Sequence, residues 1–68
     1  MSSFLFKYDL AREYFPDVSP ATARRLFSRE LRHNASLWDD LLQAGYRPAQ
    51  KRLTPRQVSI VFHYIGEP

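Results

Sequence analysis

Proline placement constrains where helices can begin and end in this chain. Ser19-Pro20 and Thr54-Pro55 both pair a hydroxyl residue with a proline. Such a pair is typical of a helix start, because the hydroxyl accepts a hydrogen bond from an otherwise unpaired backbone N–H and proline lacks an N–H that the first turn cannot use. Pro16 has the opposite effect, since its ring excludes the preceding residue from a helix. The sequence therefore predicts two helices that begin at these pairs and one that ends before Pro16.

Between these breaks, the spacing of apolar residues predicts four short helices in one all-α domain that spans residues 1–68. The predicted helices cover about residues 7–15, 20–34, 36–45 and 55–65. Each places its apolar residues on one face, as a helix that packs on a core does. The fold can also include a minimal pair of strands, formed by the stretch FLF, residues 4–6, and the connector, residues 46–53.

Local signals also indicate how the last two helices begin and end. Ser36 is the expected start of the third helix, because Asp39 lies three residues later as in a capping box. Gln57 makes the stronger example of this pattern at the fourth helix, three residues after Thr54. The two glycines of the chain are the expected stops, since glycine adopts the left-handed conformation of a helix end without steric cost.

A chain of 68 residues without cysteine depends on packing alone for its stability. Its five Phe, four Tyr and one Trp supply the bulk of one aromatic-rich core, in which Leu26 and Trp38 are expected to be buried. The lack of cysteine fits a reducing cytoplasm, and the N-terminal stretch has no basic segment or long apolar run typical of a signal peptide. The aliphatic and aromatic run at residues 60–62 is far too short to span a membrane.

The second predicted helix carries four arginines on one face. With Ala21 and Ser28 they fall within an arc of roughly 140°, at about 100° per residue, opposite the apolar residues. The four are Arg24, Arg25, Arg29 and Arg32, and none has an acid three or four residues away. Arg25 and Arg29 are a like-charged pair, which is mildly destabilising without an outside anion. Because arginine binds phosphate and guanine well, this face is either solvated or built for an anionic partner.

Three further features are candidates for binding or pairing. Arg47, Lys51 and Arg52, with Arg56, form a second basic patch, which either stays a solvated loop or clamps a phosphate backbone beside the second helix. Ile60 and Tyr64 widen the apolar face of the fourth helix and are candidates for a partner or dimer interface. Glu30 lies within the apolar arc of its helix. Since an unpaired buried carboxylate is costly, Glu30 is expected to pair with an arginine or a tyrosine hydroxyl.

No set of residues indicates an enzyme, a cofactor site or a metal site. His33 and His63 have no cysteine or suitable acid at ligand spacing, so both are expected at the surface or as caps. Asp39 and Asp40 are adjacent on a helix and diverge, which does not suit paired acid–base catalysis. The glycines form no phosphate-binding loop. The sequence therefore predicts a binding protein rather than an enzyme.

Two long stretches carry a family resemblance. The stretches "LAREYFPDVSPATARRLFSREL" and "GYRPAQKRLTPRQVSIVFHYIGEP", with "TPRQV" and the terminal "GEP" as their most specific marks, resemble a domain-of-unknown-function family of short proteins from Bacteroides-type bacteria. The resemblance covers nearly the whole chain and implies a bacterial protein without an assigned activity. The first stretch also resembles a helix-turn-helix with a slightly long, glycine-free turn. The segment "RLTPRQV" resembles the one that follows the wing in MerR-type regulators.

These features predict a nucleic-acid-binding module that presents its second helix to the major groove of double-stranded DNA. The residues expected to face bases are Arg24, Arg25 and Ser28, and those expected to face phosphates are Arg29, Arg32, Lys51 and Arg52. The alternative is a small protein–protein interaction adaptor. It would use Ile60, Tyr64 and the same arginines against an acidic protein or a second copy of the chain. Neither hypothesis involves a membrane or a small-molecule substrate.

Overall fold

The computed structural model describes the backbone of residues 5–68 and the side chains of residues 6–68. In chain order the elements are β1 (Leu5–Phe6), α1 (Lys7–Tyr14), α2 (Pro20–His33), α3 (Ala35–Gln43), β2 (Arg52–Leu53) and α4 (Pro55–Ile65). Four helices dominate this part of the chain, which confirms the predicted all-α class and all four predicted helices. The strand pair is present but minimal: β1 and β2 run antiparallel with Leu5 opposite Leu53. Residue 4 of the predicted strand lies outside the described part.

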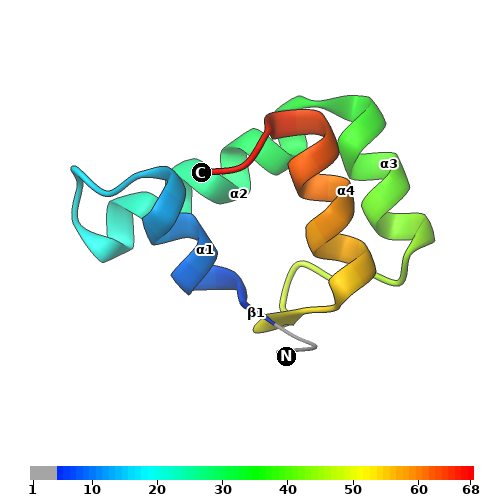
Figure 1. Cartoon of the computed structure of the whole chain (residues 1–68), viewed down its shortest axis with the longest axis horizontal. Coiled ribbons are helices and arrows are strands. Elements are labelled where there is room, and N and C mark those ends of the chain that lie inside the picture. Colours follow the sequence, from blue (N-terminus) through cyan, green and yellow to red (C-terminus); the bar gives the residue numbers. More distant parts are fainter. Residues whose placement is uncertain (1–4) are drawn as a thin grey trace.

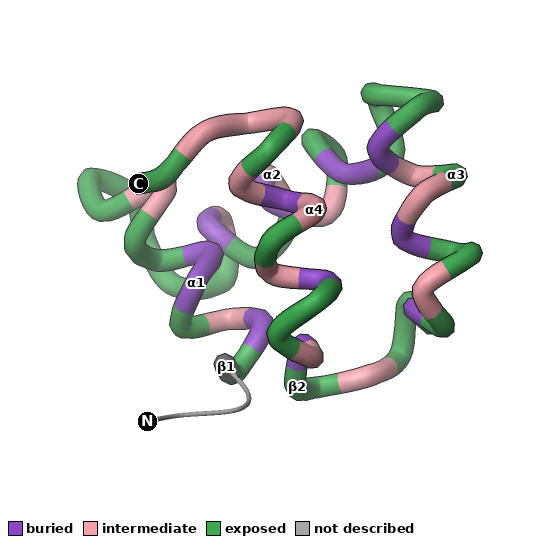
Figure 2. The backbone as a smooth tube through the Cα atoms, turned by 45° about the vertical axis from the view of Figure 1, so that its right-hand side comes forward, coloured by how far each residue is buried: buried purple, intermediate pink, exposed green. Residues whose placement is uncertain are grey.

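The helices pack in chain order around one core. Contacts join α1 to α2, α2 to α3 and α3 to α4. In Figure 1, α2 lies behind the others, with α1 at one end and the neighbouring pair α3 and α4 at the other. Figure 2 shows that buried positions recur along each helix and alternate with exposed ones, as expected of short amphipathic helices around a shared core. The β1–β2 pair fastens the start of α1 to the connector before α4.

Both proline-led helix starts form as predicted. At α2 the Ser19 hydroxyl accepts a hydrogen bond from the Thr22 N–H at 3.2 Å. At α4 the capping box is complete: Thr54 Oγ1 accepts from the Gln57 N–H at 3.2 Å, and Gln57 Oε1 accepts from the Thr54 N–H at 3.1 Å. These starts were predictable because a cap is made by residues only three positions apart.

α3 begins at Ala35, one residue before the predicted start, but the predicted capping role of Ser36 is wrong. Asn34 caps the helix instead: its Oδ1 accepts from the Leu37 N–H at 3.0 Å. The same residue ends α2, so two helices share a single residue between them. Asparagine and serine cap helices about equally well, so the local pattern does not choose between them. With Asn34 as the cap, Ser36 falls inside the first turn.

The end of α3 does follow the glycine signal. Gly45 has a φ of +83°, in the left-handed region. The Gly45 N–H donates to the Leu42 carbonyl at 3.1 Å and the Tyr46 N–H donates to the Leu41 carbonyl at 2.9 Å. This pair of bonds is the Schellman motif, which is completed by an apolar contact across the helix end. Leu41 and Tyr46 are both buried and supply the apolar side chains for it.

The core differs from the prediction at two residues. It contains Ala23, Phe27 and Leu31 from α2, whereas Leu26 is only partly buried and lies outside the core cluster. Leu26 is turned by about 100° from Phe27, at the centre of the buried stripe, so it lies on the flank of the helix. Trp38 is half-buried and packs against the core edge-on to Tyr46, with the ring centroids 5.7 Å apart. Leu26 therefore contributes less to the core than its sequence pattern indicates.

Gln57 joins three segments of the chain through a buried polar network. Its side chain is only 2 % exposed. Its Nε2 donates to the Ala44 carbonyl at the end of α3 at 3.1 Å. Its Oε1 accepts both from the Thr54 N–H and, at 2.7 Å, from Gln50 Nε2 in the connector. The capping residue predicted from a local pattern is therefore also a long-range link between α3, the connector and α4.

A matched pair of substitutions on α2 tests the assignment of its buried stripe. Leu31→Ala should lower the free energy of unfolding by about 2–5 kcal/mol, because it leaves a cavity in the core. Leu26→Ala should lower it by only about 1 kcal/mol, since the side chain is partly exposed. Urea denaturation followed by circular dichroism measures both. Equal losses for the two variants would contradict the helix phase described above.

A second pair separates the two roles of Gln57. Thr54→Ala removes the cap alone and should cost about 1 kcal/mol. Gln57→Ala removes one bond of the capping box and also leaves the Ala44 carbonyl without its partner, while the Gln50 amide keeps its bond to the Arg52 carbonyl. The unpaired Ala44 carbonyl should cost about 1–3 kcal/mol in addition to the lost capping bond. The larger loss should therefore come from Gln57→Ala in thermal or urea unfolding. If Gln57→Ala were no more destabilising than Thr54→Ala, the long-range bonds would contribute nothing.

Candidate nucleic-acid interface

The four arginines predicted on one face of α2 are all exposed. We call Arg24, Arg25, Ser28, Arg29 and Arg32 the arginine stripe; its serine is half-buried. The stripe runs from Arg24 to Arg32 along the capped, 14-residue α2, about 12 Å of helix at 1.5 Å per residue. No ion pair within 4.0 Å occurs among the side chains of residues 6–68, so no acid of this part of the chain neutralises the stripe.

Aromatic rings, instead of acids, contact both ends of the stripe. The Arg24 guanidinium lies 4.0 Å from the centre of the Tyr8 ring on α1. The Arg32 guanidinium lies 5.7 Å from the centre of the Trp38 ring on α3. Such cation–π contacts orient an arginine while its positive charge and the N–H donors at its edge remain. Arg25, Ser28 and Arg29 lie between these two ends of the stripe. Neither of these two arginines contacts an aromatic ring within residues 6–68.

The connector patch lies against the first turn of α1. Lys51 and Arg52 are both exposed. The Lys51 carbonyl accepts from the Lys7 N–H at 2.8 Å, and the Arg52 guanidinium lies 4.7 Å from the centre of the exposed Phe6 ring. Since Tyr8 follows Lys7 and contacts Arg24, the fold brings the patch toward the Arg24 end of the stripe. Arg32, eight residues further along α2, lies at the other end, beside α3.

Lys7 is a buried cation that the sequence analysis did not single out. It is only 3 % exposed, and its Nζ donates to the Pro48 carbonyl at 2.9 Å. The same Nζ lies 5.1 Å from the centre of the Tyr46 ring and 5.7 Å from that of Tyr8. No sequence signal distinguishes this lysine from an exposed one, because all these partners other than Tyr8 come from about 40 residues further along the chain.

An open hollow lies along the C-terminal half of the stripe. It has a volume of about 360 Å³ and is lined by Ser28, Arg29, Arg32 and His33. A hydroxyl and two guanidinium groups are donors suited to an anion such as phosphate. His33 is exposed, as predicted, and it lines this hollow although no sequence pattern indicates a role for it.

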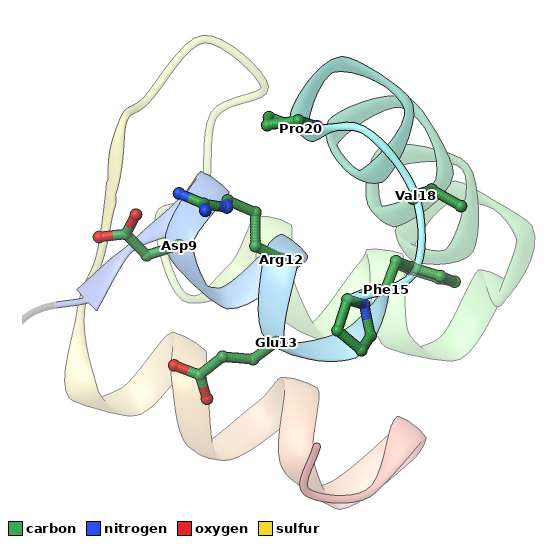
Figure 3. Close-up of a pocket in the computed structure, with 7 residues that line it drawn as sticks. Asp9, Arg12, Glu13, Phe15, Val18 and Pro20 are labelled. Atoms are coloured by element: carbon green, nitrogen blue, oxygen red, sulfur yellow. The ribbon is translucent and has the colours of Figure 1, made fainter.

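A second hollow lies at the turn between α1 and α2. It measures about 340 Å³. Figure 3 shows Asp9, Arg12 and Glu13 on α1 and Phe15, Val18 and Pro20 along the turn and the start of α2. Nearly all of these residues are exposed, and the charges are of both signs. The hollow is therefore a surface depression in which no single ligand charge is favoured.

Glu30 is not paired as the sequence predicts. It is exposed, and neither an arginine nor a tyrosine hydroxyl bonds to it among the described side chains. At about 100° per residue Glu30 points within roughly 20° of the buried Ala23, so helix phase does not explain its exposure. Two turns beyond Ala23, its side chain lines open hollows beside Phe15 instead of the core. Its charge stays in water, where it needs no partner.

Ile60 and Tyr64, the predicted partner interface, are half-buried and pack against the core. The Tyr64 hydroxyl donates to Asp40 Oδ2 at 2.5 Å. This hydrogen bond is the main cause of a raised Tyr64 pKa, because Asp40 favours the protonated phenol. Contacts within the fold thus account for both side chains, and their role in an interface stays a prediction.

The described residues contain no group of three or more His, Asp or Glu side chains placed to hold a metal ion. The two histidines lie apart on α2 and α4, and the ring of His63 meets that of Tyr64 edge-on. Among residues 5–68, no helix has both the length and the apolar character needed to cross a membrane. The arginine stripe and the connector patch are therefore the main charged features of the described surface.

Comparison with known proteins identifies a family but not an activity. A family model described as "Domain of unknown function (DUF4248)" matches residues 3–68. No curated protein and no solved structure matches the chain. The match covers nearly the full length and confirms the resemblance to a domain-of-unknown-function family. The chain belongs to the DUF4248 family.

Proposed function

We propose that this protein binds double-stranded DNA through the arginine stripe of α2. The observation that carries the proposal is the exposure of four like-charged guanidinium groups on one helix face, with no acid paired to them in residues 6–68. Like charges on one helix face are mildly destabilising in isolation, and a bound anion relieves this repulsion. DNA presents a regular array of phosphates, whose neutralisation drives binding by releasing counterions.

The proposed docking uses α1 and α2 as a helix-turn-helix pair joined by residues 15–19. The major groove is about 12 Å wide and admits one helix, which here is α2. Arg24, Arg25 and Ser28 then face base edges. The Arg24 guanidinium lies over the Tyr8 ring, and in this proposal the N–H donors at its edge bind guanine.

The remaining basic residues contact the phosphate backbone in this proposal. Arg29 and Arg32, with Ser28 and His33, line the hollow at the C-terminal half of α2, and its donors suit a phosphate oxygen. Lys51 and Arg52 reach a second backbone segment beside the Arg24 end, as a wing does. A DNA-binding role also implies a cytoplasmic location in a bacterial cell, in keeping with the cysteine-free sequence.

The adaptor hypothesis has less support at the surface first assigned to it. Ile60 and Tyr64 pack against the core, and the Tyr64 hydroxyl is bonded to Asp40. A partner at this face would therefore find little free apolar surface. The arginines remain available to an acidic protein, so the choice between the two partners depends on whether duplex DNA binds.

Salt dependence tests the proposal directly. With about four phosphate contacts, the logarithm of the affinity for a 20-base-pair duplex should fall against the logarithm of salt concentration with a slope of roughly −3 to −4, from about −0.9 per contact. Arg29→Ala should weaken binding to all sequences and bring the slope about one unit closer to zero. Arg24→Ala should instead reduce discrimination between sites, by about 1–3 kcal/mol. Fluorescence anisotropy of a labelled duplex measures all three.

Arg12→Ala is the charge-matched control, because Arg12 is exposed on α1 outside the stripe and the basic patch of the connector. It should leave the slope of the parent chain unchanged. An unchanged slope in Arg29→Ala would show that Arg29 contacts no phosphate, and equal effects of Arg29→Ala and Arg12→Ala would show that only net charge matters. Absence of duplex binding at low salt would remove the proposal altogether.

A further inference from the structure

An apolar groove lies on the flank of α2, next to the arginine stripe. Its volume is about 240 Å³, and it is lined by Tyr14, Phe15, Phe27, Glu30 and Ile65. We call this the Glu30 groove. A smaller hollow of about 170 Å³ adjoins it, shares Phe15 and Glu30, and adds Leu26, Arg29 and His33. The groove therefore lies where α1, α2 and the end of α4 meet, and it is separate from the hollow between Ser28 and Arg32.

The walls of the groove are held in place before any partner binds. The Tyr14 ring stacks on the buried Phe27 ring, with centroids 5.8 Å apart and planes 19° apart. The Tyr14 hydroxyl donates to the Gly66 carbonyl, which ties the end of α4 to α1. In Figure 1 the chain after α4 turns back toward α1, in keeping with this contact. A preformed apolar surface binds with a smaller loss of side-chain freedom than one that must first become ordered.

The dimensions of the groove suit side chains rather than a small molecule. Pockets for small molecules are usually about 300–1,000 Å³ and enclose most of the ligand. The Glu30 groove is smaller and lies open at the surface. It can take one or two side chains of a peptide segment, with their apolar parts against Phe15 and Ile65.

The charges at the rim of the groove indicate which charge a partner should carry. Glu30 is exposed and has no ion partner among the described side chains, and it is the charged residue that lines the groove itself. Glu67 and Glu13 lie close enough to Tyr14 to help raise its pKa, after the larger effect of burial. Arg29 and His33 line only the adjoining hollow, beyond Glu30. The groove is thus a negatively rimmed apolar site on a chain of net charge +3.

Two side chains of α2 that do not follow the pattern of a packed core lie beside the Glu30 groove. Leu26 is an apolar residue left partly exposed, and Glu30 is an acid in the apolar arc of α2 with no partner. Both lie on the α2 flank that faces Phe15. Side chains that do not fit the pattern of a packed helix are expected where a protein binds something else.

We propose that the Glu30 groove docks a segment of a partner protein in which a lysine or arginine is flanked by apolar residues. The apolar side chains fill the space between Phe15 and Ile65, and the cation lies against the Glu30 carboxylate. This surface is additional to the arginine stripe and does not depend on DNA binding.

Three peptides in one Gly-Ser frame test the proposal, with Leu-Lys-Leu, Leu-Gln-Leu or Leu-Glu-Leu at the centre. Backbone amide NMR shifts of the ¹⁵N-labelled chain report both the site and the affinity. The lysine peptide should shift the signals of Phe15, Glu30 and Ile65. It should bind about twofold to fivefold more tightly than the glutamine peptide, the range expected of an exposed charge pair, and the glutamate peptide should bind most weakly.

Substitutions at Glu30 then separate charge from shape. Glu30→Gln is isosteric and exposed, and it should abolish the difference between the lysine and glutamine peptides. Glu30→Lys should reverse the order and favour the glutamate peptide. Asp39→Asn, on α3 and outside the groove, removes the same charge and should preserve the preference of the parent chain.

Three results would overturn the proposal. The first is equal binding of the three peptides, or no shift with any of them at millimolar concentration. The second is a set of shifts that maps to the arginine stripe instead of the groove. The third is self-association of the chain, detected by sedimentation and abolished by Glu30→Gln, since that result would assign the groove to a second copy.

Discussion

The side chain of Gln57 is the contact on which the arrangement of the last two helices depends. It caps α4, bonds the carbonyl at the end of α3 and accepts from Gln50 in the connector. Because Gln57 is buried, its removal leaves the Ala44 carbonyl without this partner. Gln50 also donates to the Arg52 carbonyl, and the β1–β2 pair ties the same connector to α1, so these contacts help to position Lys51 and Arg52. The polar network therefore supports the connector patch of the candidate interface directly.

Aromatic rings contact several of the cationic side chains of this protein, in positions where acidic side chains could have formed ion pairs. Tyr8, Trp38 and Phe6 each contact one arginine, and the buried Lys7 lies near two tyrosines. A ring orients a cation without cancelling its charge. The exposed arginines that contact these rings, Arg24, Arg32 and Arg52, thus keep their positive charges available to an outside anion. This property is common to the duplex DNA proposal and to its alternative, an acidic protein partner.

The helix α2 presents three different surfaces. Ala23, Phe27 and Leu31 face the core, the arginine stripe faces solvent, and Leu26 with Glu30 forms a flank between them. We propose an anionic ligand for the stripe and a cationic, partly apolar segment for the flank. If both proposals hold, the opposite charges of the two surfaces would disfavour binding of either partner at the other surface.

The sequence alone determined the class of the fold, the starts of α2 and α4, the glycine stop after α3 and the arginine face. All of these depend on residues within one or two helical turns, so spacing is sufficient to predict them. Tertiary structure decided that Asn34 caps α3, that Leu26 stays outside the core and that Lys7 is buried. It also decided the Glu30 groove, whose walls, Phe15 and Ile65, are fifty residues apart in sequence. Contacts of that separation depend on how the helices cross, which no local pattern records.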